Sequence, residues 1–549
     1  MSRIIFAVLI LISFFKTSFT KEYLFNVTEF GALGDDQSNA TGAIQQAIQT
    51  CHAAGGGTVM VPSGTYRCGP LKLLSNVNLH LQPGALIKGS TNLNEYTVEE
   101  TSESGESTRA GVITARNATN VSLTGYGIVD GSALAFVDSN RIHYGVHPDY
   151  DKKFTRQGED YLSPKFGTQH GPLAHEERPG NLIRFIDCQN VRIQGVTIQN
   201  SPTWTVQIHQ CEQVDINNVN INSFASDRRV PNDDGIDLRN SRFIHISDCD
   251  IQTGDDAIAV FGSEQLTVTN CTLSARSSGI RVGYVGRDIK DCTFSNLVIH
   301  NSNRGLGVFV RGAGSVENVL FSDIIIHTRL YAGHWWGNGE PIHVSVIPFE
   351  ADVTQPGKIK NIRFRNIVAE AEHGIVIYGC ADSQIENLLF DNVQLKIKNS
   401  PLNAAYGGNF DLRSAKNMNE AIFKHDIPSL YARYVRHLEI HHFRLMWEEG
   451  LPEFFQDGIY CEHFEDVLIE DFRGRQPHLT GKGAALSLTT GAGLTVRNCR
   501  ADVGTTIFLR HGDVKDRRLF VNNDVFNARQ VFEPSVHTFQ ATGNLMPRK

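Results

Sequence analysis

The stretch Gln213-Val214-Asp215-Ile216-Asn217-Asn218-Val219-Asn220-Ile221 decides the fold. Apolar and polar residues alternate in it, and a period of two residues predicts a β-strand that buries one face. The same alternation occurs at 190–198, and it returns with openings at Ile244, Leu266, Cys292, Val319, Ile362, Leu388, Val467 and Leu494. Between 191 and 319 the openings are 22 to 30 residues apart. Such a recurrence is typical of the coils of a solenoid and not of the hairpins of a sandwich.

One coil cannot bury its apolar face alone, whereas stacked coils form continuous parallel sheets. The sequence therefore predicts an all-β fold, a right-handed parallel β-helix. Leucine-rich repeats are the rival solenoid, but they require a regular leucine spacing that this chain lacks. An asparagine precedes many of the apolar positions and is expected at bends with left-handed dihedral angles. These residues are Asn190, Asn218, Asn318, Asn361, Asn387 and Asn392.

The N-terminal section departs from the repeat. Ile44, Ala47 and Ile48 are spaced for one face of a helix over 41–53, and three consecutive glycines at 55–57 end it. This helix is expected to cap the open end of the solenoid core. We therefore expect a single domain over 21–549, with the cap and first coils in 21–100 and an insertion at 409–446.

Residues 1–20 have the pattern of a signal peptide. Arg3 provides a positive start, 4–15 form an apolar segment, and Ser18 and Thr20 suit a cleavage site. An uncleaved membrane anchor is the alternative, but the apolar segment is short for a span of about 20 residues. The sequence predicts a secreted or periplasmic protein with no membrane contact after cleavage.

The composition of the chain limits the classes of partner that it can bind. The net charge of −8 argues against nucleic acid, which requires clustered Lys and Arg residues. Among the ten cysteines, Cys249 and Cys271 fall on inward-facing positions of the repeat and are expected to pack as small hydrophobic residues. Cys51 and Cys68 are the better candidates for a disulfide bond.

Two acidic clusters are candidates for chemistry: Asn232-Asp233-Asp234-Gly235 and Gly254-Asp255-Asp256-Ala257. Asp234 and Asp256 are 22 residues apart, the length of one short coil, so the carboxylates are expected to converge on one face. Repulsion between them would raise at least one pKa, and a protonated acid beside an ionised base is what glycoside hydrolysis needs. Ordinary Asp-Gly turns and a calcium site are the alternatives.

These motifs resemble the polygalacturonase family, glycoside hydrolase family 28, within the pectin-lyase-like β-helix superfamily. The resemblance covers about 25–393 and includes 30–36, 61–66 and 199–204. The two clusters correspond to the family's Asn-Thr-Asp-Gly and Gly-Asp-Asp-Cys. The resemblance implies an inverting hydrolase without a metal or other cofactor, with Asp255 as general acid and with Asp234 and Asp256 activating the water.

This chain also departs from the family pattern. The stretch equivalent to the family's Gly-His-Gly is Ser277-Ser278-Gly279-Ile280-Arg281-Val282-Gly283, which lacks the histidine. The family's Arg-Ile-Lys, which binds the galacturonate carboxylate, aligns with Gly305-Leu306-Gly307-Val308-Phe309-Val310, which lacks both cations. Arg281, Arg304 or Arg311 could replace the lost charge. Alternatively, the site holds a neutral or deoxy sugar, as a rhamnosidase-like or other exo-acting enzyme would.

The expected substrate is therefore an acidic or rhamnose-containing plant or algal polysaccharide, or its oligosaccharides. Trp335 and Trp336 offer flat faces for sugar rings, and His334 and Glu340 could bind hydroxyls. The long segment 136–179 is expected to cover part of the cleft. The predicted substrate-binding residues are Asn232, Arg281, Arg311, His334, Trp335, Trp336 and Glu340. A polysaccharide lyase on the same fold and a non-catalytic carbohydrate-binding protein remain the alternatives.

Overall fold

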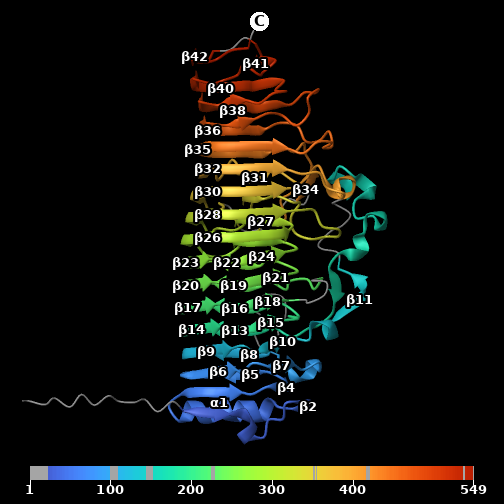
Figure 1. Cartoon of the computed structure of the whole chain (residues 1–549), viewed down its shortest axis with the longest axis vertical. Coiled ribbons are helices and arrows are strands. Elements are labelled where there is room, and N and C mark those ends of the chain that lie inside the picture. Colours follow the sequence, from blue (N-terminus) through green and yellow to red (C-terminus); the bar gives the residue numbers. More distant parts are fainter. Residues whose placement is uncertain are drawn as a thin grey trace, which may run out of the picture.

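The structure is a computed structural model that describes residues 23–98, 109–143, 152–223, 229–349, 353, 355–415, 421–535 and 538–547. The signal peptide expected at 1–20 lies outside these residues. The chain forms a tall parallel β-helix that rises from α1 (Thr41–Ala53) at one end to β42 (Gln540–Thr542) at the other (Figure 1). The predicted fold class is confirmed. Among the described residues, no helix combines the length and the hydropathy needed to cross a bilayer.

The strands pair in parallel into three stacks, which we call stacks A, B and C. Stack A comprises β1 (Leu24–Asn26), β3 (Gly57–Val61), β6 (Val77–Leu81), β9 (Thr119–Gly125), β14 (Gln189–Gln194), β17 (Glu212–Asn217), β20 (Arg242–Ser247) and β23 (Glu264–Thr269). Stack B comprises β2 (Asp35–Asn39), β4 (Gly64–Cys68), β7 (Ala85–Gly89), β10 (Ile128–Asp130), β15 (Thr197–Gln199), β18 (Asn220–Asn222), β21 (Asp250–Thr253), β24 (Thr272–Ala275), β37 (Arg473–Gly474) and β39 (Arg500–Ala501). Stack C comprises β5 (Leu71–Leu73), β8 (Ile113–Arg116), β13 (Ile183–Ile186), β16 (Val206–His209), β19 (Ile236–Arg239), β22 (Ile258–Phe261), β25 (Ser278–Tyr284), β27 (Arg304–Val310), β29 (Ile342–Val346), β31 (Ile375–Tyr378) and β41 (Gln530–Glu533).

Longer strands complete the upper coils, because there one strand bends through two stacks or, in the case of β35, through three. These are β26 (Ile289–Ser302), β28 (Val316–Thr328), β30 (Ile359–Ala371), β32 (Ile385–Ile397), β35 (Leu430–Trp447), β36 (Ile459–Glu470), β38 (Ala484–Arg497) and β40 (Ile507–Val521). Short 3-10 helices occur at η1 (Val27–Phe30) and η2 (Leu93–Glu95) near the N-terminal end.

The predicted register is confirmed residue by residue. Val191 pairs with Val214, which pairs with Ile244, and the line of partners continues through Leu266 and Cys292. It then passes through Val319, Ile362, Leu388, Leu438, Val467 and Leu494. Since every member is buried, the period-two alternation alone identified the inner face of the coils.

The bends of the coils are built on left-handed asparagines. All six predicted asparagines have φ between 52° and 58°. Their amides also stack: Asn361 donates to Asn318 at 2.9 Å and accepts from Asn387 at 2.9 Å. The residue type therefore serves both the backbone conformation and a ladder of side-chain hydrogen bonds between coils.

The core continues through all coils. Phe294, Phe321, Phe364 and Phe390 stack with ring centroids 4.9 to 5.1 Å apart. Cys249 and Cys271 are buried, as expected. The disulfide expected for Cys51 and Cys68 is wrong, since all ten cysteines are free. Cys51 lies on the inner face of α1 and Cys68 ends β4, and both pack in the core as small hydrophobic residues.

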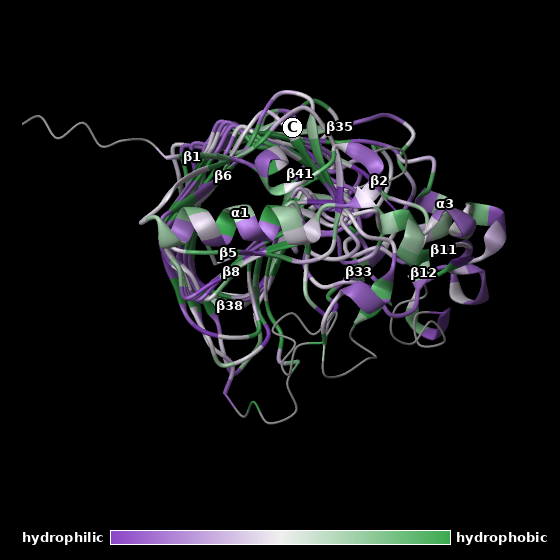
Figure 2. Cartoon of the chain, turned by 90° about the horizontal axis from the view of Figure 1, so that it is seen from below, coloured by the Kyte–Doolittle hydropathy of each residue, from purple (hydrophilic) through white to green (hydrophobic). Residues whose placement is uncertain are grey.

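The predicted capping helix is confirmed. α1 buries Ile44, Ala47 and Ile48, and it lies across the end of the helix when the molecule is seen from below (Figure 2). Gly55, Gly56 and Gly57 follow it with φ of 97°, 120° and 148°, which only glycine adopts readily, and the chain thereby turns into β3.

Three segments leave the coils and gather beside stack C, and we call them the lateral layer: 133–179, 329–341 and 398–429 (Figures 1 and 2). The first carries η3 (Ala133–Phe136), the antiparallel pair β11 (Val137–Ile142) and β12 (Leu173–His175), and η4 (Gly158–Asp160), η5 (Pro164–Phe166) and η6 (Thr168–His170). The third carries α3 (Asn403–Tyr406) and the antiparallel pair β33 (Asn409–Asp411) and β34 (Ile422–Lys424). The segments share one apolar cluster, formed by Tyr161, Leu162, Leu330, Ala405, Tyr406 and Ile422.

The insertion expected at 409–446 has different bounds. β32 ends at Ile397, and β35 re-enters the coil at Leu430 and pairs with β31 and β32. The excursion is therefore 398–429. The coil that opens at Leu438 was included in the expected insertion, although Leu438, Ile440, Phe443 and Leu445 keep the apolar alternation and are buried.

Candidate active site

Asp234, Asp255 and Asp256 lie in the turns that lead into stack C. Ile236 of β19 and Ile258 of β22 are register partners, so Asp234 on one coil lies beside Asp256 on the next. All three carboxyl groups are buried, and one oxygen of each lies within 4.8 Å of the others. The predicted stacking of the two clusters is confirmed.

The turn that carries Asp255 and Asp256 is tied at several points. The hydroxyl of Thr253 donates to the carbonyl of Asp255 at 2.6 Å. One oxygen of Asp256 accepts hydrogen bonds from the Ser277 hydroxyl at 2.7 Å and from the Ser278 N–H at 2.8 Å. Ser277 and Ser278, on the next coil, therefore fix the position of the Asp256 carboxylate.

The environments of two carboxyls push their pKa values apart. Burial, followed by the charges of neighbouring carboxylates, raises the pKa of Asp234 well above its usual value. Burial acts in the same direction on Asp256, but the charge and hydrogen bonds of Arg281 outweigh it and lower the pKa of Asp256. One carboxyl is thus held protonated beside one that is held ionised, as acid–base chemistry requires.

Arg281 lies among the carboxylates and not at the far side of the cavity. Its Nε donates to Asp256 and its Nη2 lies 3.4 Å from Asp234. The guanidinium is 4.3 Å from the Phe261 ring centroid and 5.4 Å from that of Tyr284. The three carboxylates are close enough to share a cation, and Arg281 supplies a positive charge there.

A cavity of about 250 Å³ opens above the carboxylates. Its walls combine carboxylates, arginines and aromatic rings. The lining residues are Trp204, Asn232, Asp234, Arg239, Asp255, Asp256, Phe261, Ser277, Ser278, Arg281, Tyr284, Val285, Arg304, Phe309, Trp336 and Arg413. Of the predicted substrate-binding residues, Asn232, Arg281 and Trp336 are among them.

Arg311 and Trp335 lie outside the cavity lining, contrary to expectation. Arg311 is fully buried, and its Nη2 donates to the Ser345 hydroxyl at 3.0 Å. Trp335 is buried as well, while its neighbour Trp336 faces the cavity. The two adjacent rings therefore lie in different environments within an irregular segment, which sequence alone could not assign.

His334 and Glu340 are also absent from the lining and support residues that belong to it. The Nε2 of His334 lies 2.6 Å from Nη1 of Arg413. Glu340 is fully buried and lies 3.5 Å from Nη2 of Arg304. Although burial acts in the opposite direction, Arg304 and His343 hold the pKa of Glu340 far below its usual range.

Sequence reasoning missed several lining residues. Phe261 and Arg239 share a register line on stack C, and Trp204 stacks on Phe261 at 5.6 Å. The sequence feature that could have identified them is their position close to the strands that follow the acidic turns. Arg413 gave no such signal, because the excursion 398–429 brings it to the cavity from a coil far along the chain.

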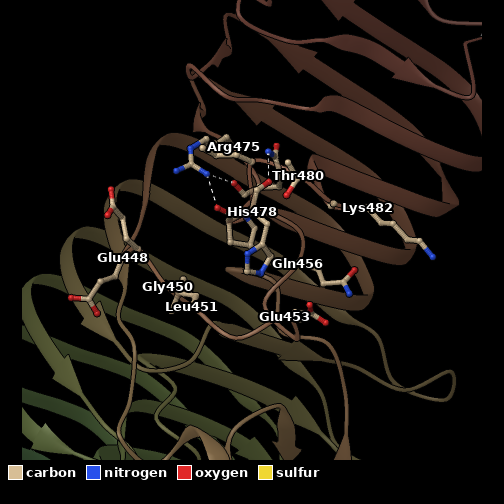
Figure 3. A pocket seen from close by; sticks show the side chains of 15 residues that line it. Glu448, Gly450, Leu451, Glu453, Gln456, Arg475, His478, Thr480 and Lys482 are labelled. Carbon is tan, nitrogen blue, oxygen red and sulfur yellow. Dashed lines mark hydrogen bonds between the residues drawn. The ribbon is translucent and has the colours of Figure 1, made fainter.

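A larger cavity, of about 610 Å³, lies between the coils near 448–483 and shares no lining residue with the first (Figure 3). Glu448 and Lys482 lie on opposite sides of it, and Arg475 donates to the carbonyls of Gln476 and Pro477 at 2.7 Å. Glu449 and Glu453 are exposed to solvent. It lacks the buried, converging carboxylates of the first cavity.

Known proteins resemble this chain over most of its length. Curated relatives include a probable polygalacturonase of Arabidopsis thaliana, 28% identical over 323 residues, which cover 57% of this chain and 60% of the relative. An exo-poly-alpha-D-galacturonosidase of Dickeya chrysanthemi is 29% identical over 252 residues, 42% of this chain and 41% of that protein. The matched part is therefore less than two thirds of these relatives' length.

Solved structures share the fold. A family 28 exopolygalacturonase of Yersinia enterocolitica superposes with a TM-score of 0.58 at 19% identity, over 81% of this chain and 78% of that one. The model of glycosyl hydrolases family 28 matches residues 51–405, more than half of the chain and the part that holds all three aspartates. This chain therefore belongs to glycosyl hydrolases family 28.

Proposed function

We propose that the protein is an inverting glycoside hydrolase that cleaves a glycosidic bond in an acidic pectic polysaccharide or its oligosaccharides. The observation that carries the proposal is the cluster of Asp234, Asp255 and Asp256 at the floor of the cavity, with Arg281 between two of them. The electrostatics agree with the base role of Asp256, because Arg281 holds this carboxyl ionised.

The three carboxyls divide the chemistry. Asp255 protonates the leaving oxygen, and the ionised Asp256 takes a proton from the attacking water. Asp234, whose raised pKa keeps it protonated, holds that water by a hydrogen bond. Their closest oxygens lie within 4.8 Å, whereas inverting enzymes separate the carboxyl groups by about 6.5–9.5 Å. Identifying the anomer that is released first, by NMR, therefore tests inversion directly.

The cavity favours an acidic sugar over the neutral or deoxy sugar that the sequence left open. Four arginines line it, at positions 239, 281, 304 and 413, and guanidinium groups bind carboxylates well. Its aromatic rings offer faces for sugar rings. The names of the relatives, polygalacturonase and exo-poly-alpha-D-galacturonosidase, agree with a galacturonate-containing substrate.

Action at a chain end also fits the cavity. The lateral layer covers stack C on the side of the later coils, where Phe410 and His425 each lie 5.0 Å from the buried ring of Tyr431. The volume of about 250 Å³ is below the roughly 300–1,000 Å³ of sites for drug-sized ligands. We expect release of mono- or disaccharides from the first minutes, without a rapid fall in substrate viscosity.

Export belongs to the same proposal. A pectic polymer is found outside the cell, and residues 1–20 have the pattern of a signal peptide. Expression of the full chain in a bacterial host, followed by N-terminal sequencing of the mature protein, tests this: a new N-terminus near residue 21 supports export.

One assay distinguishes the three functions that the sequence allowed. The protein is incubated with a panel of pectic and algal polysaccharides while reducing sugar and ultraviolet absorbance are followed together. A hydrolase releases reducing ends without new absorbance, a lyase produces both, and a carbohydrate-binding protein produces neither. Asp255→Asn should lower kcat by roughly 10²–10⁴, and substantial residual turnover would contradict the role of Asp255.

A further inference from the structure

Two polar atoms on the cavity wall have no hydrogen-bond partner in the part of the chain that the structure describes, apart from those of the aspartates. They are Oγ of Ser278 and Nε of Arg304, and both side chains are buried, with exposures of 0% and 4%. Nearly all buried polar atoms in folded proteins have partners. Two unpaired atoms on one cavity wall indicate where polar groups of a ligand bind.

The two residues are neighbours. Ser278 begins β25, Arg304 begins β27, and they are register partners in these adjacent strands. The N–H of Ser278 donates to Asp256 at 2.8 Å. The pair therefore lies directly beside the carboxylates that are proposed to perform catalysis.

Arg304 is charged and only loosely held. Its two contacts to protein oxygens, Glu340 Oε1 at 3.5 Å and the carbonyl of Asp411 at 3.4 Å, are long for hydrogen bonds of a guanidinium. Its charge lies 5.1 Å from the Phe309 ring centroid. The ionised Glu340 behind it keeps the guanidinium oriented while leaving hydrogen-bonding capacity toward the cavity.

The backbone explains why the charge comes from this position. The stretch from Gly305 to Val310, which aligns with the family's carboxylate-binding segment, carries no cation. A Cβ on Gly305 would lie 2.4 Å from the Pro341 carbonyl oxygen, and one on Gly307 would lie 2.6 Å from the Phe309 ring. A side chain at position 305 would therefore collide with backbone, and one at position 307 would require the Phe309 ring to move.

We propose that Ser278 and Arg304 form the subsite that binds the carboxylate and a neighbouring hydroxyl of a uronate residue next to the cleaved bond. Arg304 contributes a charged donor to the carboxylate, and the Ser278 hydroxyl donates to or accepts from the sugar. This assignment rests on the proposed function and adds to it the two residues that select the acidic sugar.

The test compares an acidic substrate with its uncharged form. Wild type, Arg304→Gln, Arg304→Lys and Ser278→Ala are assayed on trigalacturonate and on its methyl ester. Arg304→Gln should raise KM for trigalacturonate about 10- to 100-fold and change that for the ester about two-fold or less, because only the charged bond is lost. Arg304→Lys should recover part of the lost affinity for trigalacturonate. Ser278→Ala should weaken the binding of both substrates slightly.

Arg311→Gln is the matched control. Arg311 is also buried, its guanidinium lies 4.9 Å from the same Phe309 ring, and its Nε is also unpaired, but it lies outside the cavity lining. It measures the cost of removing a buried guanidinium without removing the subsite. Thermal unfolding of every variant identifies those that fail to fold, and for Arg304→Gln the lysine variant then carries the comparison.

An equal loss on the acidic and esterified substrates in the Arg304 variants would overturn the subsite. Failure of the wild type to hydrolyse either substrate would instead contradict the proposed function. Calorimetric titration of trigalacturonate into Asp255→Asn, with and without Arg304→Gln, keeps the two failures apart. The subsite predicts 10- to 100-fold weaker binding in the double variant even where no turnover is seen, and equal affinities would refute it.

Discussion

At the scale of single residues, Arg281 controls the ionisation of Asp256. This chain has a serine where the family has a histidine, and an arginine three positions later reaches back to the carboxylates. Removing its charge as Arg281→Gln should raise the pKa of Asp256, because burial is then opposed only by the hydrogen bonds from Ser277 and Ser278. The acidic limb of the kcat–pH profile should move to higher pH, and kcat at the optimum should fall by roughly 10²-fold or more.

Arg281→Lys separates charge from geometry. It keeps a cation near Asp256 but loses the fork of donors. We expect an acidic limb close to that of the wild type and a reduced kcat. If the limb of Arg281→Gln stays where it is in the wild type, Arg281 does not set the ionisation of Asp256.

Asp233 makes a prediction about stability. It is fully buried, its Oδ2 lies 2.5 Å from the Ser223 hydroxyl, and burial raises its pKa to about 7. The unfolded pKa is about 3.9, so the native state holds a proton that the unfolded state loses. The corresponding stability is present below about pH 4 and is lost as the pH rises through about 7, and it amounts to about 4 kcal/mol at most.

Asp233→Asn keeps a neutral hydrogen-bonding group at the same place. The variant should lose less thermal stability than the wild type between pH 5 and pH 8, as measured by scanning calorimetry at several pH values. Parallel curves for the two proteins would mean that Asp233 does not titrate in this range.

Site residues were predictable where the repeat itself places them. Asp234 and Asp256 are one coil length apart, so their contact followed from the register. The roles of Arg281 and Glu340 were not predictable in the same way, since each depends on which of two faces a side chain takes beside a neighbour from another coil. Arg281 turned toward the aspartates, and Glu340 turned inward to Arg304.

At the scale of elements, the asparagine ladder gives a direct test of how the coils are bent. Asn361 has φ of 58° and links Asn318 to Asn387. Asn361→Ala loses both the tolerance for this conformation and the ladder, and should destabilise the protein by about 1–2 kcal/mol. Asn361→Gly keeps the conformation and loses only the ladder, so it should cost less.

Urea denaturation measures both variants. Asn399 is a suitable control position, because its side chain contacts Gly450 and Asn403 and does not belong to the ladder. Equal losses in Asn361→Ala and Asn361→Gly would show that the hydrogen bonds alone matter.

Whole elements were predictable from the sequence wherever one face is buried. From Val191 to Leu388 the expected openings are the observed register partners. The coil at Leu438 was missed because it opens 50 residues after Leu388, beyond the spacing of 22 to 30 residues seen between 191 and 319. Elements with no period, such as β33 and β34, form through contacts with distant segments and leave no local signal.

At the scale of the molecule, the coils and the lateral layer are stabilised by different kinds of contact. Each coil packs mainly on its nearest neighbours, so we expect the solenoid to keep its fold when the lateral layer is loosened. The lateral layer has no repeat, and it is held by contacts between segments that are more than 200 residues apart, such as 152–179 and 398–429. The position of the layer over the cavity could not be derived from the sequence. The long segment at 136–179 indicated only that part of the cleft is covered.

Arg156 is the main polar link between these two segments. Its N–H donates to the Asn409 side chain at 2.7 Å, and its guanidinium donates to the carbonyls of Gly408 and His425 at 3.1 Å and to Asp426 at 3.0 Å. Arg156→Ala removes the guanidinium contacts and leaves the coils intact. The same excursion carries Arg413 into the cavity, so loosening it should disturb the site from a distance.

We expect Arg156→Ala to lower kcat/KM about ten-fold, mainly through KM, and to speed amide hydrogen exchange at 403–413, while the thermal unfolding of the coils changes little. Lys165→Ala is the matched control, since it removes a surface ion pair with Asp160 inside one segment of the layer. If both variants behave like the wild type in hydrogen exchange and in kinetics, the lateral layer does not depend on the contacts of Arg156. If Arg156→Ala instead unfolds the coils, the lateral layer and the solenoid form one cooperative unit, because the loss of the Arg156 contacts then destabilises strands that Arg156 does not touch.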